Sequence, residues 1–253
     1  MITDAYSTAS DPIITPESCI GPQRHIADTC IVTFSDVIMQ SVLDAWPCET
    51  VGRIRTCGGV TPVYTLSHRR RTLAVLQAHV GSAMAASDVI ETNWLTGASR
   101  FIVFGSCGCL DQDAARGRYI LPTAAYRDEG MSYHYAPPAD YIEMPGAAVT
   151  AKVFDAAGIP YVLGKTWTTD AFYRELRHQM IQRRAEGCLA VDMEAAGLQA
   201  VCDFHGFSLY CFLMAGDVLD QPKWDVGNLS LANHHLENFH IALKIAEQLE
   251  AAS

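Results

Sequence analysis

The feature that most constrains this sequence is a short stretch in which an apolar run leads directly into two acids and then into a helical pattern. Cys188–Val191 has the composition of a buried strand, and Asp192 and Glu194 follow it on either side of a methionine. Glu194, Leu198 and Val201 occupy positions i, i+4 and i+7, so they share one face of a helix. We therefore expect a buried strand that passes into a helix with Glu194 in its first turn, pointing from the edge of the core into a cleft.

Two roles are open for Glu194. Near the positive end of a helix, a carboxylate is well placed to accept hydrogen bonds from a pair of vicinal hydroxyls on a ligand. The alternative is an acid that only helps to cap its own helix.

Segments of strand and helix character alternate along the chain, which predicts one α/β domain over residues 1–253. Its central sheet is expected to be mixed, mostly parallel and twisted, and flanked by helices in three layers, with ligands at the carboxyl ends of the strands. The polar, small residues 1–12 predict a loose tail. Strands are expected near residues 30–34, 51–54, 63–66, 73–80, 100–104, 119–124, 161–164, 188–191 and 207–215, and the longer helices near 81–95, 149–157, 170–186 and 230–251.

Three further features fall near the expected strand ends. Gly105–Gly108 is expected to form a glycine-rich turn after a buried strand, with backbone N–H groups that could converge on an anion or a sugar. Asp217 ends an apolar strand, where α/β enzymes place a general acid, and Phe172 could stack on a flat ligand. The structural alternatives are a plain connecting turn, a turn or cap aspartate and a core aromatic.

Composition limits the class of protein. A net charge of −10 argues against nucleic acid as a partner, and no apolar run or leader suggests a membrane or secretion. The 9 cysteines are dispersed and odd in number, which favours reduced thiols in a cytoplasmic protein. Cys107 and Cys109 lack a CxxC partner, so no metal site is expected.

Together these residues resemble the nucleoside phosphorylase family, which includes uridine phosphorylase, hexameric purine nucleoside phosphorylase and the methylthioadenosine nucleosidases. The resemblance covers roughly residues 30–250, and its most specific part is Val191–Ala196, with support from Thr169–Tyr173 and Arg127–Tyr135. It implies a pentosyltransferase of nucleoside catabolism and salvage. Such an enzyme cleaves the N-glycosidic bond of uridine or a purine nucleoside with phosphate, giving the free base and ribose 1-phosphate.

The resemblance also implies roles for single residues. Glu194 would hold the 2′- and 3′-hydroxyls of the ribose, with Met193 beneath the sugar. Ser106 would contact ribose and phosphate, and Phe172 would stack on the base. Asp217 matches the acid with which purine-acting members protonate or hydrogen-bond the departing base.

The identity of the base stays open at this point. Asp217 favours a purine, whereas Arg127–Tyr135 and Thr166–Glu175 are more similar to uridine-acting relatives. Those relatives read uracil with a glutamine and an arginine after the stacking phenylalanine. Arg174 is the nearby arginine here, and the glutamine is not evident.

The phosphate site departs from the family pattern. The usual Gly-Asp-x-x-Arg after the first strand is replaced by Thr33–Met39, which has no arginine, and the arginine expected before the glycine turn is Val103. Phosphate needs charged donors or several backbone donors. A further arginine that a neighbouring subunit donates in the family has no clean match here, and Arg53 and Arg55 are the nearest candidates. The candidate phosphate contacts are Gly105, Ser106, Arg55 and Arg127.

Three hypotheses for the activity follow from these residues. The first is phosphorolysis, with phosphate as co-substrate and no other cofactor, in a homodimer or homohexamer whose subunits share their sites. The second is hydrolysis by a nucleosidase, for which Glu17 is the only acid near the usual position of a water-orienting glutamate. The third is a nucleoside-binding protein without turnover.

Overall fold

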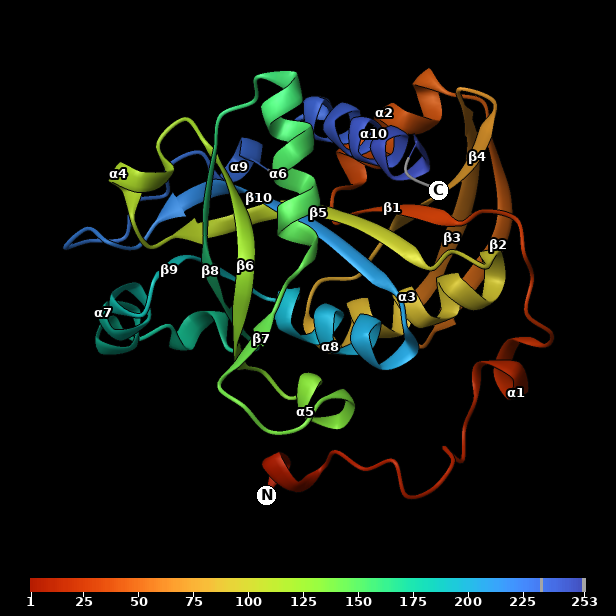
Figure 1. Cartoon of the computed structure of the whole chain (residues 1–253), viewed down its shortest axis with the longest axis horizontal. Helices are drawn as coiled ribbons and strands as arrows, with labels where there is room; N and C mark the ends of the chain where they lie inside the picture. The colour runs from red at the N-terminus through yellow and green to blue at the C-terminus, as the bar shows by residue number, and fades with distance from the viewer. Residues whose placement is uncertain (233, 252–253) are drawn as a thin grey trace.

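A ten-stranded mixed sheet organises the chain in the computed structural model, which describes residues 1–232 and 234–251. The expectation of one α/β domain with helices on both faces of the sheet is confirmed (Figure 1). The strands are β1 Thr29–Thr33, β2 Cys48–Thr56, β3 Gly59–His68, β4 Arg71–Gln77, β5 Arg100–Cys109, β6 Tyr119–Asp128, β7 Tyr141–Glu143, β8 Tyr161–Thr169, β9 Cys188–Asp192 and β10 Ser208–Val218.

The helices form two layers around the sheet. Figure 1 shows α2, α6 and α10 on one face and α3, α5 and α8 on the other. None of the helices in the described part of the chain combines the length and the apolar composition needed to cross a bilayer. The α-helices are α1 Pro16–Ile20, α2 Asp36–Ala45, α3 Ser82–Thr96, α4 Gln112–Ala115, α5 Ser132–Tyr135, α6 Gly146–Ala157, α7 Arg177–Ala185, α8 Ala195–His205, α9 Leu229–Ala232 and α10 Leu236–Ala251, and the 3-10 helices are η1 Ile2–Asp4 and η2 Phe172–Arg174.

Alternation along the central strands builds a separate core on each face of the sheet. In β1, Cys30 and Val32 pack into the core shared with α3 and α8, whereas Ile31 packs into the core shared with α2, α6 and α10. Ile102 and Phe104 of β5 join Ile31 in that second core. Because both faces are covered, these strands read as continuous apolar runs in the sequence.

The strand order closes part of the sheet on itself. The path runs β10-β6-β8-β9-β5-β1-β4-β3-β2, and β10 also pairs with β5, so β5, β9, β8, β6 and β10 form a ring. In this ring Gly108 lies opposite Val191 of β9 and Asp217 of β10. A Cβ atom on Gly108 would lie 2.7 Å from Val191 Cγ1 and 2.7 Å from Leu219 Cδ1. Glycine is therefore needed where β5 passes between its neighbours.

Three expectations about local structure are wrong. Gly105–Gly108 is not a turn, because β5 continues to Cys109 and pairs with β10 along this stretch. The expected helix over 170–186 is interrupted at Glu175, whose extended backbone separates η2 from α7. The final helix is divided into α9 and α10.

The expected loose tail over 1–12 includes η1, which contacts α5, and a half-buried Tyr6. Residues 252–253 of the expected domain lie outside the described residues.

Helices α3 and α8 touch through a glycine. A Cβ atom on Gly197 would lie 2.7 Å from Ser82 Cβ and 2.9 Å from its Oγ. The Ser82 hydroxyl donates a hydrogen bond of 2.9 Å to the carbonyl of Met193, directly before α8. This contact therefore couples the position of α3 to the stretch that carries Glu194.

We predict that Gly197→Ala destabilises the protein by about 1–3 kcal/mol, because overpacking at this contact outweighs the roughly 1 kcal/mol gained in helix propensity. Thermal melting of the purified variant measures the change. In the double variant Ser82→Gly, Gly197→Ala, room returns at the contact and part of the stability should be restored. An unchanged or raised melting temperature for Gly197→Ala alone would show that the contact is not tight.

Candidate active site

The cleft lies where β5, β9 and β10 end beside one another. An inner cavity of about 150 Å³ is lined by residues of all three strands and of the turn into α8. An outer cavity of about 380 Å³ adjoins it and is lined largely by η2, the start of α7 and the loop after β10. Phe172, Glu175 and Asp217 line both cavities, so the two form one continuous cleft.

Most of the residues selected from the sequence meet in the inner cavity. Six of them line it, from four separate segments of the chain: Gly105, Ser106, Phe172, Met193, Glu194 and Asp217. The apolar part of the wall includes Phe34, which belongs to the Thr33–Met39 stretch. The convergence follows from the ring of strands, which brings the ends of β5, β9 and β10 together.

Asp192 holds the central stretch in place. Its Oδ1 accepts hydrogen bonds from Thr166 Oγ1 at 3.0 Å and Thr168 Oγ1 at 2.8 Å. Its Oδ2 accepts from the backbone N–H groups of Glu194 at 3.0 Å and Ala195 at 2.6 Å. Burial raises the pKa of Asp192, and these four hydrogen bonds oppose the rise. A buried aspartate thus ties the start of α8 to β8.

Glu194 stands at the N-cap position of α8, directly before the first turn in which it was expected. Its side chain does not cap that helix, so the simple capping alternative is wrong. Instead Oε1 accepts a hydrogen bond of 2.7 Å from the N–H of Gly81, at the start of α3. Burial raises the pKa of Glu194 to about 8, and repulsion from Asp192 adds to the rise. The carboxyl is fixed on one side and faces the inner cavity on the other.

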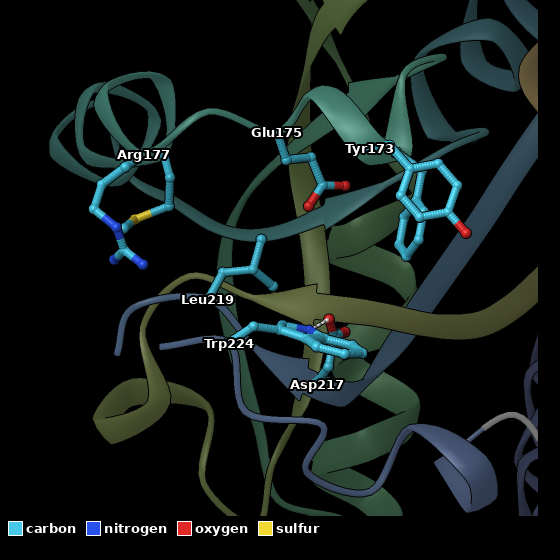
Figure 2. Close-up of a pocket in the computed structure, with 8 residues that line it drawn as sticks. Tyr173, Glu175, Arg177, Asp217, Leu219 and Trp224 are labelled. Carbon is cyan, nitrogen blue, oxygen red and sulfur yellow. Dashed lines mark hydrogen bonds between the residues drawn. The ribbon is translucent and has the colours of Figure 1, made fainter. Parts of the chain in front are cut away.

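Asp217 is 5% exposed and lies just beyond a bulge between Ala215 and Asp217 in β10. The indole Nε1–H of Trp224 donates a hydrogen bond of 2.7 Å to Asp217 Oδ2 (Figure 2). The loop after β10 thus turns back over its own strand and supplies both a donor for Asp217 and an aromatic wall for the outer cavity.

Glu175 is a cleft residue that the sequence patterns did not single out. It follows η2 in the extended segment before α7, and Figure 2 shows its carboxyl and that of Asp217 reaching toward each other across the cleft. Burial raises the pKa of Glu175 to about 7, and the negative charge of Asp217 contributes to the rise. Its position three residues after Phe172 was the available signal.

The arginines selected from the sequence do not line the cleft. The guanidinium of Arg127 donates to Ser132 Oγ at 2.8 Å and to the carbonyls of Pro137 at 2.6 Å and Ala136 at 3.2 Å, and it lies 4.2 Å from the ring centre of Tyr133. Three of its five N–H donors are engaged within its own loop, and Arg127 lines neither the inner nor the outer cavity.

The remaining polar candidates also lie elsewhere. Arg55 is on the β2–β3 hairpin opposite Val60, and Arg174 is exposed on η2. Arg177 lines the outer cavity instead, with its guanidinium bonded to the carbonyl of Pro222 at 3.2 Å. Glu17 is exposed on α1. Among the described residues that line the inner cavity there is no lysine, arginine or histidine.

We predict that Glu194→Gln becomes more stable relative to the wild type as the pH rises. Between its ordinary value of 4.5 and about 8, folded Glu194 keeps a proton that the unfolded chain has lost, so the free energy of unfolding falls through this window. Glutamine removes this loss and can keep the bond from Gly81. We expect a relative gain on the order of 1–2 kcal/mol from pH 5 to pH 8, measured by urea unfolding.

The exposed Glu49, changed to Gln, is the control and should show no such trend. A stability difference between Glu194→Gln and the wild type that is flat with pH would contradict the assigned protonation.

Comparison with known proteins identifies the family of this chain. Residues 29–251 match the model of the phosphorylase superfamily. A DeoD-type purine nucleoside phosphorylase of Exiguobacterium sibiricum is 28% identical over 235 residues, covering 88% of this chain and 94% of that protein. A uridine phosphorylase of Salmonella typhimurium is 25% identical over 193 residues, covering 66% of this chain and 75% of that protein.

Among solved structures, the AMP nucleosidase of Bacteroides thetaiotaomicron superposes with a TM-score of 0.65 at 22% identity, covering 89% of this chain and 91% of that one. This likeness concerns the fold alone. Because the family model covers the sheet, the central stretch and every strand end that forms the cleft, this chain belongs to the phosphorylase superfamily.

Proposed function

We propose that the protein breaks the N-glycosidic bond of a nucleoside and transfers the ribosyl group to inorganic phosphate. The observation that carries this proposal is the convergence of Ser106, Met193, Glu194, Phe172 and Asp217 on one cleft. The inner cavity has the carboxyl and the apolar floor that a ribose needs. The outer cavity has aromatic walls and two carboxyl groups, which suit a planar base.

The chemistry accounts for the placement of the acids. Breaking the bond builds positive charge on the ribose and negative charge on the base. Glu194 orients the ribose hydroxyls and, once ionised, stabilises the positive sugar. Donation by those hydroxyls also favours the ionised form of this carboxyl, whose pKa burial raises to about 8. Asp217 supplies a proton or a hydrogen bond to the departing base, and Phe172 holds the ring.

Phosphate as acceptor is supported by the names of the relatives, which include purine nucleoside phosphorylases and a uridine phosphorylase. The cleft of a single chain supplies Ser106 on the ribose side. In this proposal the cation comes from a second copy of the chain, through Arg53 or Arg55 on the exposed face of β2.

Hydrolysis is the second candidate, and a specific observation favours it. The described lining of the inner cavity has no cationic side chain, and Arg127 is engaged in its own loop. Water needs no such cation, whereas a phosphate dianion does.

Product analysis separates the two candidates. Purified protein is incubated with inosine, adenosine and uridine, with and without phosphate, and the free base and sugar product are quantified. Phosphorolysis predicts base release that depends on phosphate, with ribose 1-phosphate formed in equal amount. Equal base release without phosphate, with free ribose, would replace the first candidate by the second. No base release from any nucleoside would remove both and favour a binding protein.

We predict that Glu194→Gln lowers kcat about a hundredfold, roughly 3 kcal/mol of transition-state stabilisation, with a smaller effect on substrate binding. The swap conserves volume, so the fold should survive, and thermal melting checks this. Asp217→Asn should depend on the substrate. It should impair cleavage of purine nucleosides, whose N7 takes the proton, more than that of uridine. A Glu194→Gln enzyme with kcat within a few-fold of wild type would exclude the ribose-binding role.

A further inference from the structure

The outer cavity contains two carboxyl groups with very little to neutralise them. Glu175 enters from the segment before α7 and Asp217 from β10, and Figure 2 shows Glu175 and Tyr173 on one side of the cavity and Asp217 and Trp224 on the other. Trp224 donates to Asp217, but no hydrogen bond from a described side chain reaches the Glu175 carboxyl. Arg177 is directed away from the pair and bonds to the carbonyl of Pro222.

Burial and the negative charge of Asp217 raise the pKa of Glu175 to about 7. In the proposed reaction Asp217 supplies the proton or hydrogen bond to the base. Glu175, which receives no hydrogen bond from a described side chain, then offers its carboxyl oxygens to a donor on the same base. The cleft thus combines one donor and one acceptor for the edge of the ring.

This pattern selects between purine bases. A 6-aminopurine presents an acceptor, N7, beside a donor, the exocyclic amino group. A 6-oxopurine presents two acceptors, N7 and O6, and needs two donors. With Asp217 as the donor to N7 and the Glu175 carboxyl as the acceptor from the amino group, both groups on this edge of a 6-aminopurine are paired. Against a 6-oxopurine, the Glu175 carboxyl would meet O6, a second acceptor that repels it.

We propose that Glu175, together with Asp217, selects nucleosides of 6-aminopurines over those of 6-oxopurines. This inference rests on the proposed cleavage of nucleosides at the same cleft. It adds the base class, which the residues selected from the sequence leave open between purine and pyrimidine. It also assigns a specificity role to a residue outside that set.

The decisive variant is Glu175→Gln, because its amide adds a permanent donor at nearly the same volume. Values of kcat/KM are measured for adenosine, inosine and purine riboside, which has no substituent at C6. In the wild type we expect adenosine to exceed inosine by about tenfold or more, since a site built for a donor rejects its replacement by an acceptor. In Glu175→Gln the ratio should fall at least about tenfold, with purine riboside within about threefold of wild type.

Two further variants serve as a control and as a substitute for Glu175→Gln. Glu49→Gln changes an exposed glutamate on β2 and should leave the ratio at its wild-type value. Glu175→Ala removes the carboxyl without adding a donor. It should lower adenosine turnover without the matching gain for inosine, and it serves where Glu175→Gln does not fold.

A binding measurement separates failure of this inference from failure of the proposed function. Calorimetric titration with adenine and with hypoxanthine requires no turnover. Tighter adenine binding in the wild type, reversed or abolished in Glu175→Gln, supports the inference even if no nucleoside is cleaved. Cleavage with an adenosine-to-inosine ratio that Glu175→Gln leaves within about threefold overturns the inference and leaves the proposed function standing. A wild-type preference for inosine and hypoxanthine overturns it as well.

Discussion

The cleft depends on the four hydrogen bonds that Asp192 accepts. Two come from threonines of β8 and two from the first amides of the turn into α8, so one buried carboxylate joins a strand, a turn and a helix. Thr168 adds a bond from the N–H of Ala196, which leaves little freedom at this helix start. Glu194 lies in the middle of this network. Its position is therefore set by the sheet and not by the mobility of a loop.

The second constraint is electrostatic. Glu175, Asp192, Glu194 and Asp217 all line the cleft, and the net charge of the chain is −10. Burial raises the pKa of Glu175, Asp192 and Glu194, which disfavours the charged form of these groups until a ligand supplies hydrogen-bond donors. A nucleoside supplies such donors through its hydroxyls and its base. The same negative charge repels an approaching phosphate dianion. The choice between phosphate and water as the acceptor of the ribosyl group therefore depends on whether a cation is supplied.

The fold and part of the site could be predicted from the sequence. Buried strands leave continuous apolar runs, and their ends meet in an α/β sheet, so Ser106, Glu194 and Asp217 could be placed together from the sequence alone. The glycines of β5 predict a turn, and this prediction is wrong because only the pairing with β10 shows that the strand continues. Glu175 and Trp224 belong to segments whose paths are decided by packing at a distance. Such segments carry no periodic signal.

Arg127 is the opposite case, a residue that the sequence selects for the cleft and that the structure places elsewhere. A polar, aromatic loop suggests ligand contacts, but three donors of its guanidinium are bonded to Ser132 and to two carbonyls of the loop itself. Composition shows which groups are available. Only the folded loop shows which of them are already engaged.

The closed ring of strands also determines when the cleft can exist during synthesis. Ser208 of β10 pairs with Arg100 of β5, so the ring closes only through contacts between segments far apart in the chain. Such long-range pairing is slow relative to local helix formation. A nascent chain that has already made β5 and α3 still lacks Asp217, Trp224 and one side of the ring. Until β10 emerges and docks, the apolar flank of β5 is an unpaired edge, and chaperone binding at that edge would compete directly with completion of the site.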